Sequence, residues 1–311
     1  MTSSARSKST LTPRVVTLRI SGCWTALVTP FTADGAVDEQ ALRLLVDWQI
    51  TEGIHGLVPI GSTGEAVTLT AQERDRVVRI VVEAAAGRVP IMAGAGSNDT
   101  KQAVENSKAM RAAGATHLLH VSPMYNKPPQ RGLIAHFKAI AESAGLPVCV
   151  YNVPGRTASN IEPATTLALA DVPSIVAVKE ASGNLAQIDE IIRHRPPHFA
   201  VLSGDDSFTL AVMGAGGDGV VSVISNAVPR AMAQLCERAA KGDLTGARSA
   251  HAKLAPFMSA AFVESNPIPV KAAMAMLGRM QNVLRLPLVP LRAELSSTVR
   301  RALVDAGALS S

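Results

Sequence analysis

Lys179 closes a short apolar segment, residues 174–180, and a glycine-containing turn follows it at once. An amine at the end of a buried strand is partly withdrawn from water, which disfavours the ammonium and leaves a neutral amine that can attack a carbonyl carbon. This placement indicates Schiff-base chemistry on a keto substrate. The alternative is a structural lysine whose charged end extends from the strand into solvent.

Five further polar side chains stand at strand ends or in short loops and would suit a reaction on a 2-oxo acid: Ser62, Thr63, Tyr125, Tyr151 and Arg156. Hydroxyls and backbone amides in a glycine-rich turn can bind a small carboxylate, a phenol can move protons, and a guanidinium can hold a second carboxylate. Each has a structural alternative: an ordinary tight turn for the first two, an interface contact for Tyr125, a core position for Tyr151 and a surface ion pair for Arg156.

Short apolar segments alternate with longer amphipathic ones eight times. The apolar segments are typical of buried parallel strands and cover residues 24–29, 56–60, 90–94, 117–122, 147–151, 174–179, 200–203 and 219–223. Between them, apolar residues recur at spacings of three and four, which predicts helices over residues 38–53, 70–87, 99–113, 130–144, 163–170, 184–194, 206–214 and 227–240. Helix starts are expected at the capping residues Asp38, Thr70, Asp99 and Asp206.

Eight strand-helix units close most simply into an α/β fold of the (β/α)8 TIM-barrel type, here over residues 21–240. A doubly wound open sheet is the alternative. Residues 241–311 predict helices near 243–262, 268–279 and 290–307, which we expect to pack on the barrel as a C-terminal helical appendage. In a barrel the strand ends converge, so Lys179 and the five polar residues would meet at one face. That convergence favours the Schiff-base interpretation.

The composition excludes several other classes of protein. The chain is 47% hydrophobic but only 3% aromatic, and no apolar stretch is long enough to span a membrane. Most of the net charge of +5 comes from residues 1–20, a basic tail rich in Ser and Thr. The remainder is nearly neutral, so we expect no nucleic-acid partner. The tail is expected to be disordered, with a transit peptide as the alternative.

The sequence offers no convincing metal or cofactor site. Cys23, Cys149 and Cys236 have no metal-ligand spacing and read as reduced core residues of a cytoplasmic protein. Asp205 and Asp206 are adjacent but lack a third ligand, and one of them should cap a helix. The glycine-rich loops lack the strand-GxGxxG-helix order of a dinucleotide site. Lys271 is a competing nucleophile, but it opens a helix beyond the barrel, which favours a structural role.

Six ordered motifs, GSTGE, SPMYNKP, YNVPGRT, VKEASGN, LSGDD and NPIPVK, strongly resemble the dihydrodipicolinate synthase (4-hydroxy-tetrahydrodipicolinate synthase) family from about Ser21 to about Ala308. The resemblance implies a barrel enzyme that condenses pyruvate with aspartate-semialdehyde on the route to diaminopimelate and lysine. It also implies that no cofactor is used and that the chain forms a homotetramer built from two tight dimers.

The resemblance also assigns roles to individual residues. Lys179 would form the imine with pyruvate, Thr63 would hold its carboxylate, and Arg156 would bind the carboxylate of the semialdehyde. Gly204 and Val221 would line the pyruvate pocket.

Ser62, Tyr151 and Tyr125 match the proton relay of the family, in which the residue at the position of Tyr125 reaches into the neighbouring subunit. Ser62 stands where many members carry threonine, and either hydroxyl can relay a proton.

Lysine-inhibited members carry polar and acidic groups around an effector site at the dimer interface. In this sequence only Asn98 is retained, and the other matching positions are Ala66, Ala71, Arg74, Gln102 and Met124. Because Arg74 replaces a neutral group and Gln102 replaces a carboxylate, attraction for a cationic amino acid is reduced. We expect weak or absent feedback by lysine.

Other functions remain open at this stage. Related Schiff-base enzymes include N-acetylneuraminate lyase and 2-keto-3-deoxy sugar-acid aldolases. Arg156 favours the synthase, because a sugar acid would need hydroxyl-binding groups at that place. A non-catalytic barrel that binds small acids is a further alternative, which the presence of Lys179, Tyr151 and Tyr125 disfavours.

Overall fold

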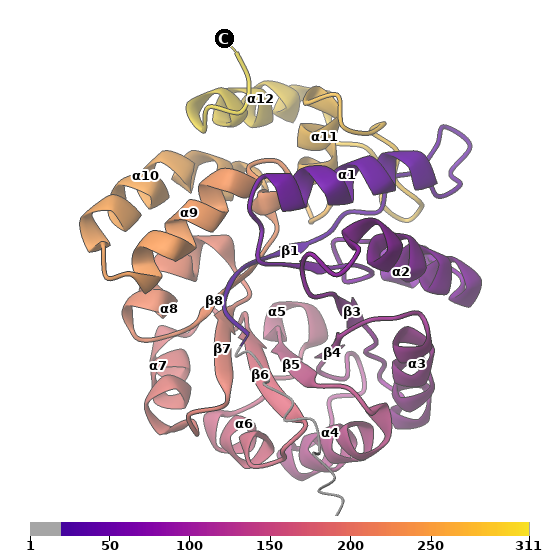
Figure 1. The fold of residues 1–311 in the computed structure, drawn as a ribbon, viewed down its shortest axis with the longest axis vertical. Helices are drawn as coiled ribbons and strands as arrows, with labels where there is room; N and C mark the ends of the chain where they lie inside the picture. The colour runs from indigo at the N-terminus through magenta and orange to yellow at the C-terminus, as the bar shows by residue number, and fades with distance from the viewer. Residues whose placement is uncertain (1–19, 311) are drawn as a thin grey trace, which may run out of the picture.

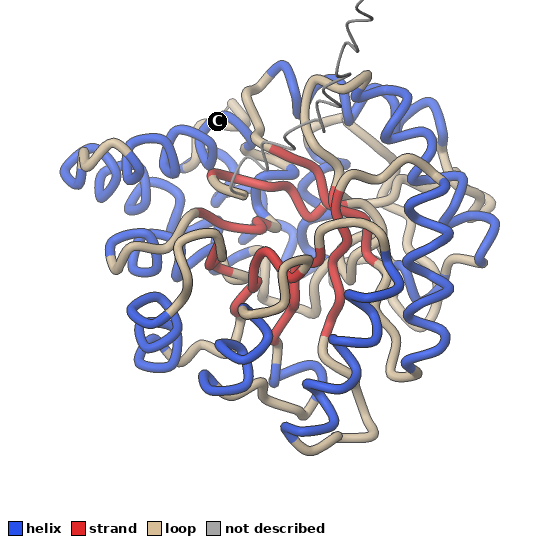
Figure 2. Tube along the Cα trace, turned by 60° about the horizontal axis from the view of Figure 1, so that its bottom comes forward, coloured by secondary structure: helices blue, strands red, loops and turns tan. Residues whose placement is uncertain are grey.

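The computed structural model describes residues 20–310, in which eight parallel strands are surrounded by helices (Figures 1 and 2). The strands are β1 (Gly22–Ala26), β2 (Gly56–Val58), β3 (Met92–Gly94), β4 (His117–Val121), β5 (Val148–Asn152), β6 (Ile175–Glu180), β7 (Ala200–Ser203) and β8 (Gly219–Ser222). All eight expected strands exist. Strands β2 and β3 are shorter than expected because Pro59 and Pro90, which lack a backbone N–H, lie just outside them.

The strands follow the order β2-β1-β8-β7-β6-β5-β4-β3, and a parallel bridge between Leu57 and Ile91 joins the two ends. A doubly wound sheet would reverse its strand order partway along, whereas this order runs once around a ring. The chain therefore folds as the predicted (β/α)8 barrel. The prediction of a disordered tail lies, apart from Ile20, outside the described residues.

Helices follow the strands and form the outer ring in Figure 1. In the part of the chain that the structure describes they are α1 (Glu39–Thr51), α2 (Ala71–Ala85), α3 (Thr100–Ala112), α4 (Gln130–Ala144), α5 (Pro154–Thr157), α6 (Pro163–Ala170), α7 (Leu185–His194), α8 (Thr209–Gly214), α9 (Pro229–Ala240), α10 (Leu244–Ala260), α11 (Ile268–Met276) and α12 (Ser296–Asp305). The one-turn helix α5 was not expected: Pro154 opens it at a position where its missing N–H is not needed.

Three of the four expected caps are correct. The side chains of Asp38, Thr70 and Asp99 each accept a hydrogen bond from a backbone N–H in the first turn of α1, α2 and α3. The prediction for Asp206 is wrong, because Asp205 caps the turn over residues 206–208. Asp206 instead accepts hydrogen bonds from the backbone amides that follow β8.

Apolar side chains form two separate layers. Because successive strand residues point to opposite faces, one set fills the barrel interior and the other packs against the helices. The interior layer includes Trp24, Met92, Cys149 and Leu202, and all of them are buried. The outer layer is larger and consists mainly of aliphatic residues from strands and helices. Two rigid layers on either side of the strands fix the direction of every side chain at the strand ends.

The chain beyond the barrel continues with α10, which packs along α9, and with α11 and α12, which pack against each other at the top of Figure 1; α12 also packs against α10. The last helix begins at Ser296 rather than near residue 290. Between α10 and α11 the chain returns to the barrel and places Asn266 in a buried position. Within residues 20–310, no helix has the length and apolar character needed to cross a membrane.

Candidate active site

Lys179 and Tyr151 are direct partners in the register of β6 and β5. Both side chains are buried, with 6% and 8% of their surface exposed, and the Nζ atom of Lys179 lies 4.0 Å from the centroid of the Tyr151 ring. The amine is therefore enclosed at the end of the barrel interior and lies against the face of a phenol. This is the environment that the sequence predicted for Lys179.

Glycine at position 204 leaves room for this lysine. A Cβ atom on Gly204 would lie 3.1 Å from Cε of Lys179 and 2.7 Å from Cβ of Ala181. Any larger residue would displace the amine or the turn that follows it. Val221 lies on β8 in the same interior layer as Tyr151. Gly204 thus lies against the lysine, and Val221 belongs to the interior layer of the barrel; their role in lining a pyruvate pocket stays a prediction.

A polar network on the outer side of the strands holds their ends together. Asn152 and Glu180 follow Tyr151 and Lys179 and point the opposite way, between the barrel and the helices. The Glu180 carboxylate accepts hydrogen bonds from Nδ2 of Asn152 at 3.1 and 3.2 Å and from Nε2 of Gln187 at 3.1 Å. Sequence reasoning missed this network, although a buried acid and amide directly after the two candidate residues could have indicated it.

The loop after β2 brings Thr63 into contact with the C-terminal region. Nδ2 of Asn266 donates a hydrogen bond to Oγ1 of Thr63 at 2.9 Å, and Nη2 of Arg156 donates to the backbone oxygen of Asn266 at 3.2 Å. Asn266 thus connects the two residues expected to bind carboxylates. Its Oδ1 atom is buried and has no hydrogen-bond partner within residues 20–310. Ser62, by contrast, is exposed at the surface of the loop.

Asn266 was not identified as a site residue from the sequence. It lies in the NPIP segment, which contributed to the family resemblance but follows the last strand by more than forty residues. Only a polar side chain directly before Pro267, in a segment with a second proline, could have indicated a special position.

Tyr125 is separated from the enclosed residues. Its side chain is 88% exposed, and its backbone has φ of +72°, a left-handed conformation that non-glycine residues rarely adopt. Its backbone N–H donates to the Thr157 carbonyl at 3.3 Å. Among the described residues, no hydrogen bond joins the side chains of Tyr125, Tyr151 and Ser62. A single chain therefore does not assemble the relay that the sequence predicted.

Other buried groups that could have competed as nucleophiles are occupied or unreactive. Burial lowers the pKa of Lys271 to about 8, although the nearby Glu65 carboxylate acts to raise it. The Lys271 amine is already engaged, because it contacts that carboxylate at 2.6 Å and the Thr29 carbonyl at 2.9 Å. Burial raises the pKa of the Cys149 thiol to about 12. The structural interpretation of Lys271 agrees with these contacts.

The two histidines of β4 face opposite sides of the strand. The ring of His117 meets Trp24 edge-on, and His120 contacts Ser107 at 3.1 Å. Burial lowers the pKa of His117 to about 4 and that of His120 to about 3, so both rings are neutral at physiological pH.

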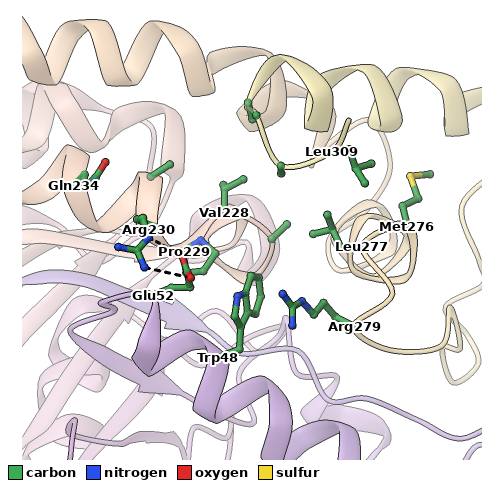
Figure 3. Close-up of a pocket in the computed structure, with 15 residues that line it drawn as sticks. Trp48, Glu52, Val228, Pro229, Arg230, Gln234, Met276, Leu277, Arg279 and Leu309 are labelled. Atoms are coloured by element: carbon green, nitrogen blue, oxygen red, sulfur yellow. Dashed lines mark hydrogen bonds and ion pairs between the residues drawn. The ribbon is translucent and has the colours of Figure 1, made fainter. Parts of the chain in front are cut away.

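A cavity of about 470 Å³ lies on the outer side of the barrel between α1, α9 and the C-terminal region (Figure 3). In it the Arg279 guanidinium lies 4.2 Å from the centroid of the Trp48 ring, and Arg230 pairs with Glu52 at 2.9 Å. None of the residues predicted to take part in the reaction lines this cavity. The candidate site is therefore the end of the barrel around Lys179.

Comparisons with known proteins agree with the barrel fold. A 4-hydroxy-tetrahydrodipicolinate synthase of Nitratidesulfovibrio vulgaris (strain Miyazaki F) is 50% identical over 291 residues, which cover 93% of this chain and 99% of that protein. The dihydrodipicolinate synthase of Acinetobacter baumannii, described as chloride inhibited and complexed with pyruvate, is 42% identical with a TM-score of 0.92 and covers 93% of this chain and all of its own.

A third similar structure is described as the first monomeric dihydrodipicolinate synthase variant; it is 41% identical, has a TM-score of 0.91, and the match covers 93% of this chain and 97% of that one. Residues 19–306 match the model of the dihydrodipicolinate synthetase family. The barrel, the enclosed lysine and these matches together show that the chain belongs to the dihydrodipicolinate synthetase family.

Proposed function

We propose that this chain is a lyase that condenses pyruvate with L-aspartate 4-semialdehyde through a Schiff base on Lys179, the step that leads to diaminopimelate and lysine. The observation that carries the proposal is the enclosed Lys179 amine against the Tyr151 ring, because a desolvated amine beside a proton carrier is what imine formation requires. Relatives that are half identical over nearly their whole length carry the name of this activity.

The first half of the reaction uses residues of the barrel end. The neutral Lys179 amine attacks C2 of pyruvate, and the carbinolamine loses water to give the imine, with protons carried by Tyr151 and Ser62. Thr63 holds the pyruvate carboxylate, with its hydroxyl oriented by Asn266. The protonated imine withdraws electrons from the methyl group, which then loses a proton to give an enamine.

The second half joins the two substrates. The enamine carbon attacks the aldehyde carbon, while Arg156 binds the carboxylate of the semialdehyde. The buried Oδ1 atom of Asn266 is an acceptor for the amino group of the same substrate. That amino group then displaces Lys179 from C2, which closes the ring and frees the enzyme.

The assembly and location are also proposals. Tyr125 completes the proton relay by entering the site of a neighbouring subunit in a tight dimer, and two such dimers form a homotetramer. Its high exposure in the single chain supports this role. Three free and buried cysteines support residence in the reducing cytoplasm.

Trapping the imine tests the function. Incubation with pyruvate and sodium borohydride should leave one reduced adduct, which peptide mapping should place on Lys179. Addition of aspartate semialdehyde should consume pyruvate, while N-acetylneuraminate and 2-keto-3-deoxy sugar acids should release none. An adduct on Lys271 would overturn the assignment of the lysine. Pyruvate release from a sugar acid would favour an aldolase, and the absence of any adduct or turnover would favour a binding protein.

A further inference from the structure

The loop that carries Thr63 ends at Glu65, a residue in an unusual state. Its backbone has φ of +54°, in the left-handed region, and its side chain is completely buried. A buried carboxylate is tolerated only when hydrogen bonds and opposite charge compensate for the water it loses. The groups that compensate Glu65 all come from the C-terminal region beyond the barrel.

Two such groups hold the two oxygens of the carboxylate. Oε1 of Glu65 accepts a hydrogen bond from Nζ of Lys271 at 2.6 Å, and Oε2 accepts one from the backbone N–H of Arg285 at 3.1 Å. The Lys271 ammonium also donates to the Thr29 carbonyl at 2.9 Å and lies 4.2 Å from the centroid of the Phe31 ring. The ion pair is therefore fixed by contacts on every side.

The same group of residues also holds Gly64, which lies between Thr63 and Glu65. The Thr29 hydroxyl donates to the backbone oxygen of Gly64 at 2.7 Å. Lys271 donates to the backbone of Thr29 and to the side chain of Glu65. Both residues that follow Thr63 are therefore connected to one buried ammonium, Gly64 by way of Thr29 and Glu65 directly. A shift of that ammonium would move the backbone of the loop.

From these contacts we infer that Glu65, Lys271 and Thr29 are positioning residues, which hold the loop so that Thr63 meets the carboxylate of pyruvate. This inference rests on the proposed function. A buried ion pair is often no more stabilising than an apolar pair of the same size. Stability alone therefore does not explain why Glu65 and Lys271 are charged. The directional bonds of this pair instead fix the loop, and the C-terminal region becomes part of the active site.

The central experiment compares Glu65→Gln, Lys271→Met and the double variant. Each single change leaves an unpaired buried group and should lower the melting temperature. The double variant removes both charges and should melt close to the parent. The readout is the pyruvate concentration that gives half-maximal borohydride trapping on Lys179. If the pair positions the loop, this concentration should be about tenfold or more higher in the double variant than in the parent. The reason is that a small misplacement of a binding group weakens the complex. The rate at saturating pyruvate should change less.

A matched control is the pair formed by Arg195 and Asp218, whose side chains are about 10% exposed at the other end of the barrel. Replacing it by Arg195→Met with Asp218→Asn should leave half-saturation by pyruvate unchanged. Thr29→Val removes one neutral hydrogen bond and should raise half-saturation several-fold even if the charged variants do not fold. A double variant, or Thr29→Val, with the parent's half-saturation would overturn the inference. A parent that traps no pyruvate would instead contradict the proposed function.

Discussion

The floor of the candidate site and its rim are built in opposite ways. On the floor, Lys179 and Tyr151 lie on neighbouring strands, are buried, and are fixed from behind by a network that includes Glu180. On the rim, Tyr125 lies on a loop with a left-handed backbone and is 88% exposed. The difference teaches that contacts within one chain fix the floor, whereas the role proposed for Tyr125 requires a second subunit.

The largest expected effect comes from the floor. Lys179→Ala should reduce condensation more than about a thousandfold, because within residues 20–310 the other buried lysine, Lys271, is held by Glu65. Turnover measured with both substrates would show the loss, and the thermal melting curve would show that the barrel remains folded. A variant that retained even a tenth of the parent's rate would move the chemistry away from Lys179.

A mixing experiment separates rim from floor. Tyr125→Phe should lose about a hundredfold in rate, but unfolding and refolding it together with Lys179→Ala should recover about a quarter of the parent's activity. Half of the random dimers then contain both variants, and in each of these one site combines an intact Lys179 with the intact Tyr125 of its neighbour.

The matched control for this experiment is Tyr151→Phe. Mixed with Lys179→Ala it should recover nothing, because Tyr151 and Lys179 belong to the same subunit. Equal recovery from both mixtures, or from neither, would contradict the proposed division between floor and rim.

Asp206, in the turn that follows β7, is a buried carboxyl whose charge is costly. Burial raises the pKa of Asp206 to about 6, even though the backbone amides of Ile224 and Val223 donate to it. The folded protein thus binds this proton more tightly than the unfolded chain, so the stabilisation is present at low pH and is lost as the pH rises through 6. Asp206→Asn removes the titration.

The difference in unfolding free energy between Asp206→Asn and the parent should therefore shift by about 2 kcal/mol in favour of the variant between pH 4.5 and pH 7.5. Urea unfolding at the two pH values measures the change, and the neutral histidines of β4 cancel in the comparison. A difference in unfolding free energy that does not vary with pH would show that folding does not raise the pKa of Asp206.

The smallest expected effect is a null result near the rim. The family resemblance of the sequence matches Arg74 and Gln102 to a neutral and an acidic group of lysine-inhibited members, so we expect these positions not to attract a cation. Submillimolar lysine should leave the rate unchanged. Inhibition in that range would mean that the rim binds lysine through other groups.

Sequence reasoning reached the floor more easily than its supports. The alternation of strands and helices predicted the barrel, and a barrel brings strand ends together, so Lys179 and Tyr151 could be placed before any coordinates. Asn266 could not be placed this way, because it lies in an irregular segment between two helices. No periodic pattern in that segment predicts that it returns to the barrel.

The choice between Asp205 and Asp206 shows a second limit. Adjacent residues of the same type differ only in the direction of their side chains, which the turn decides. Asp205 caps the following turn, and Asp206 turns inward to the amides after β8. The short helix α5 was missed for a similar reason, since a single turn is too brief to produce a repeating pattern.

Asn266 and Lys271 also have a consequence for the synthesis of the protein. Both residues leave the ribosome only after all eight strands have been made, so a nascent chain can assemble the barrel while Thr63 still lacks its partner. Pyruvate in the cell would then stabilise finished molecules and leave incomplete ones unaffected, because a ligand favours only the state that binds it.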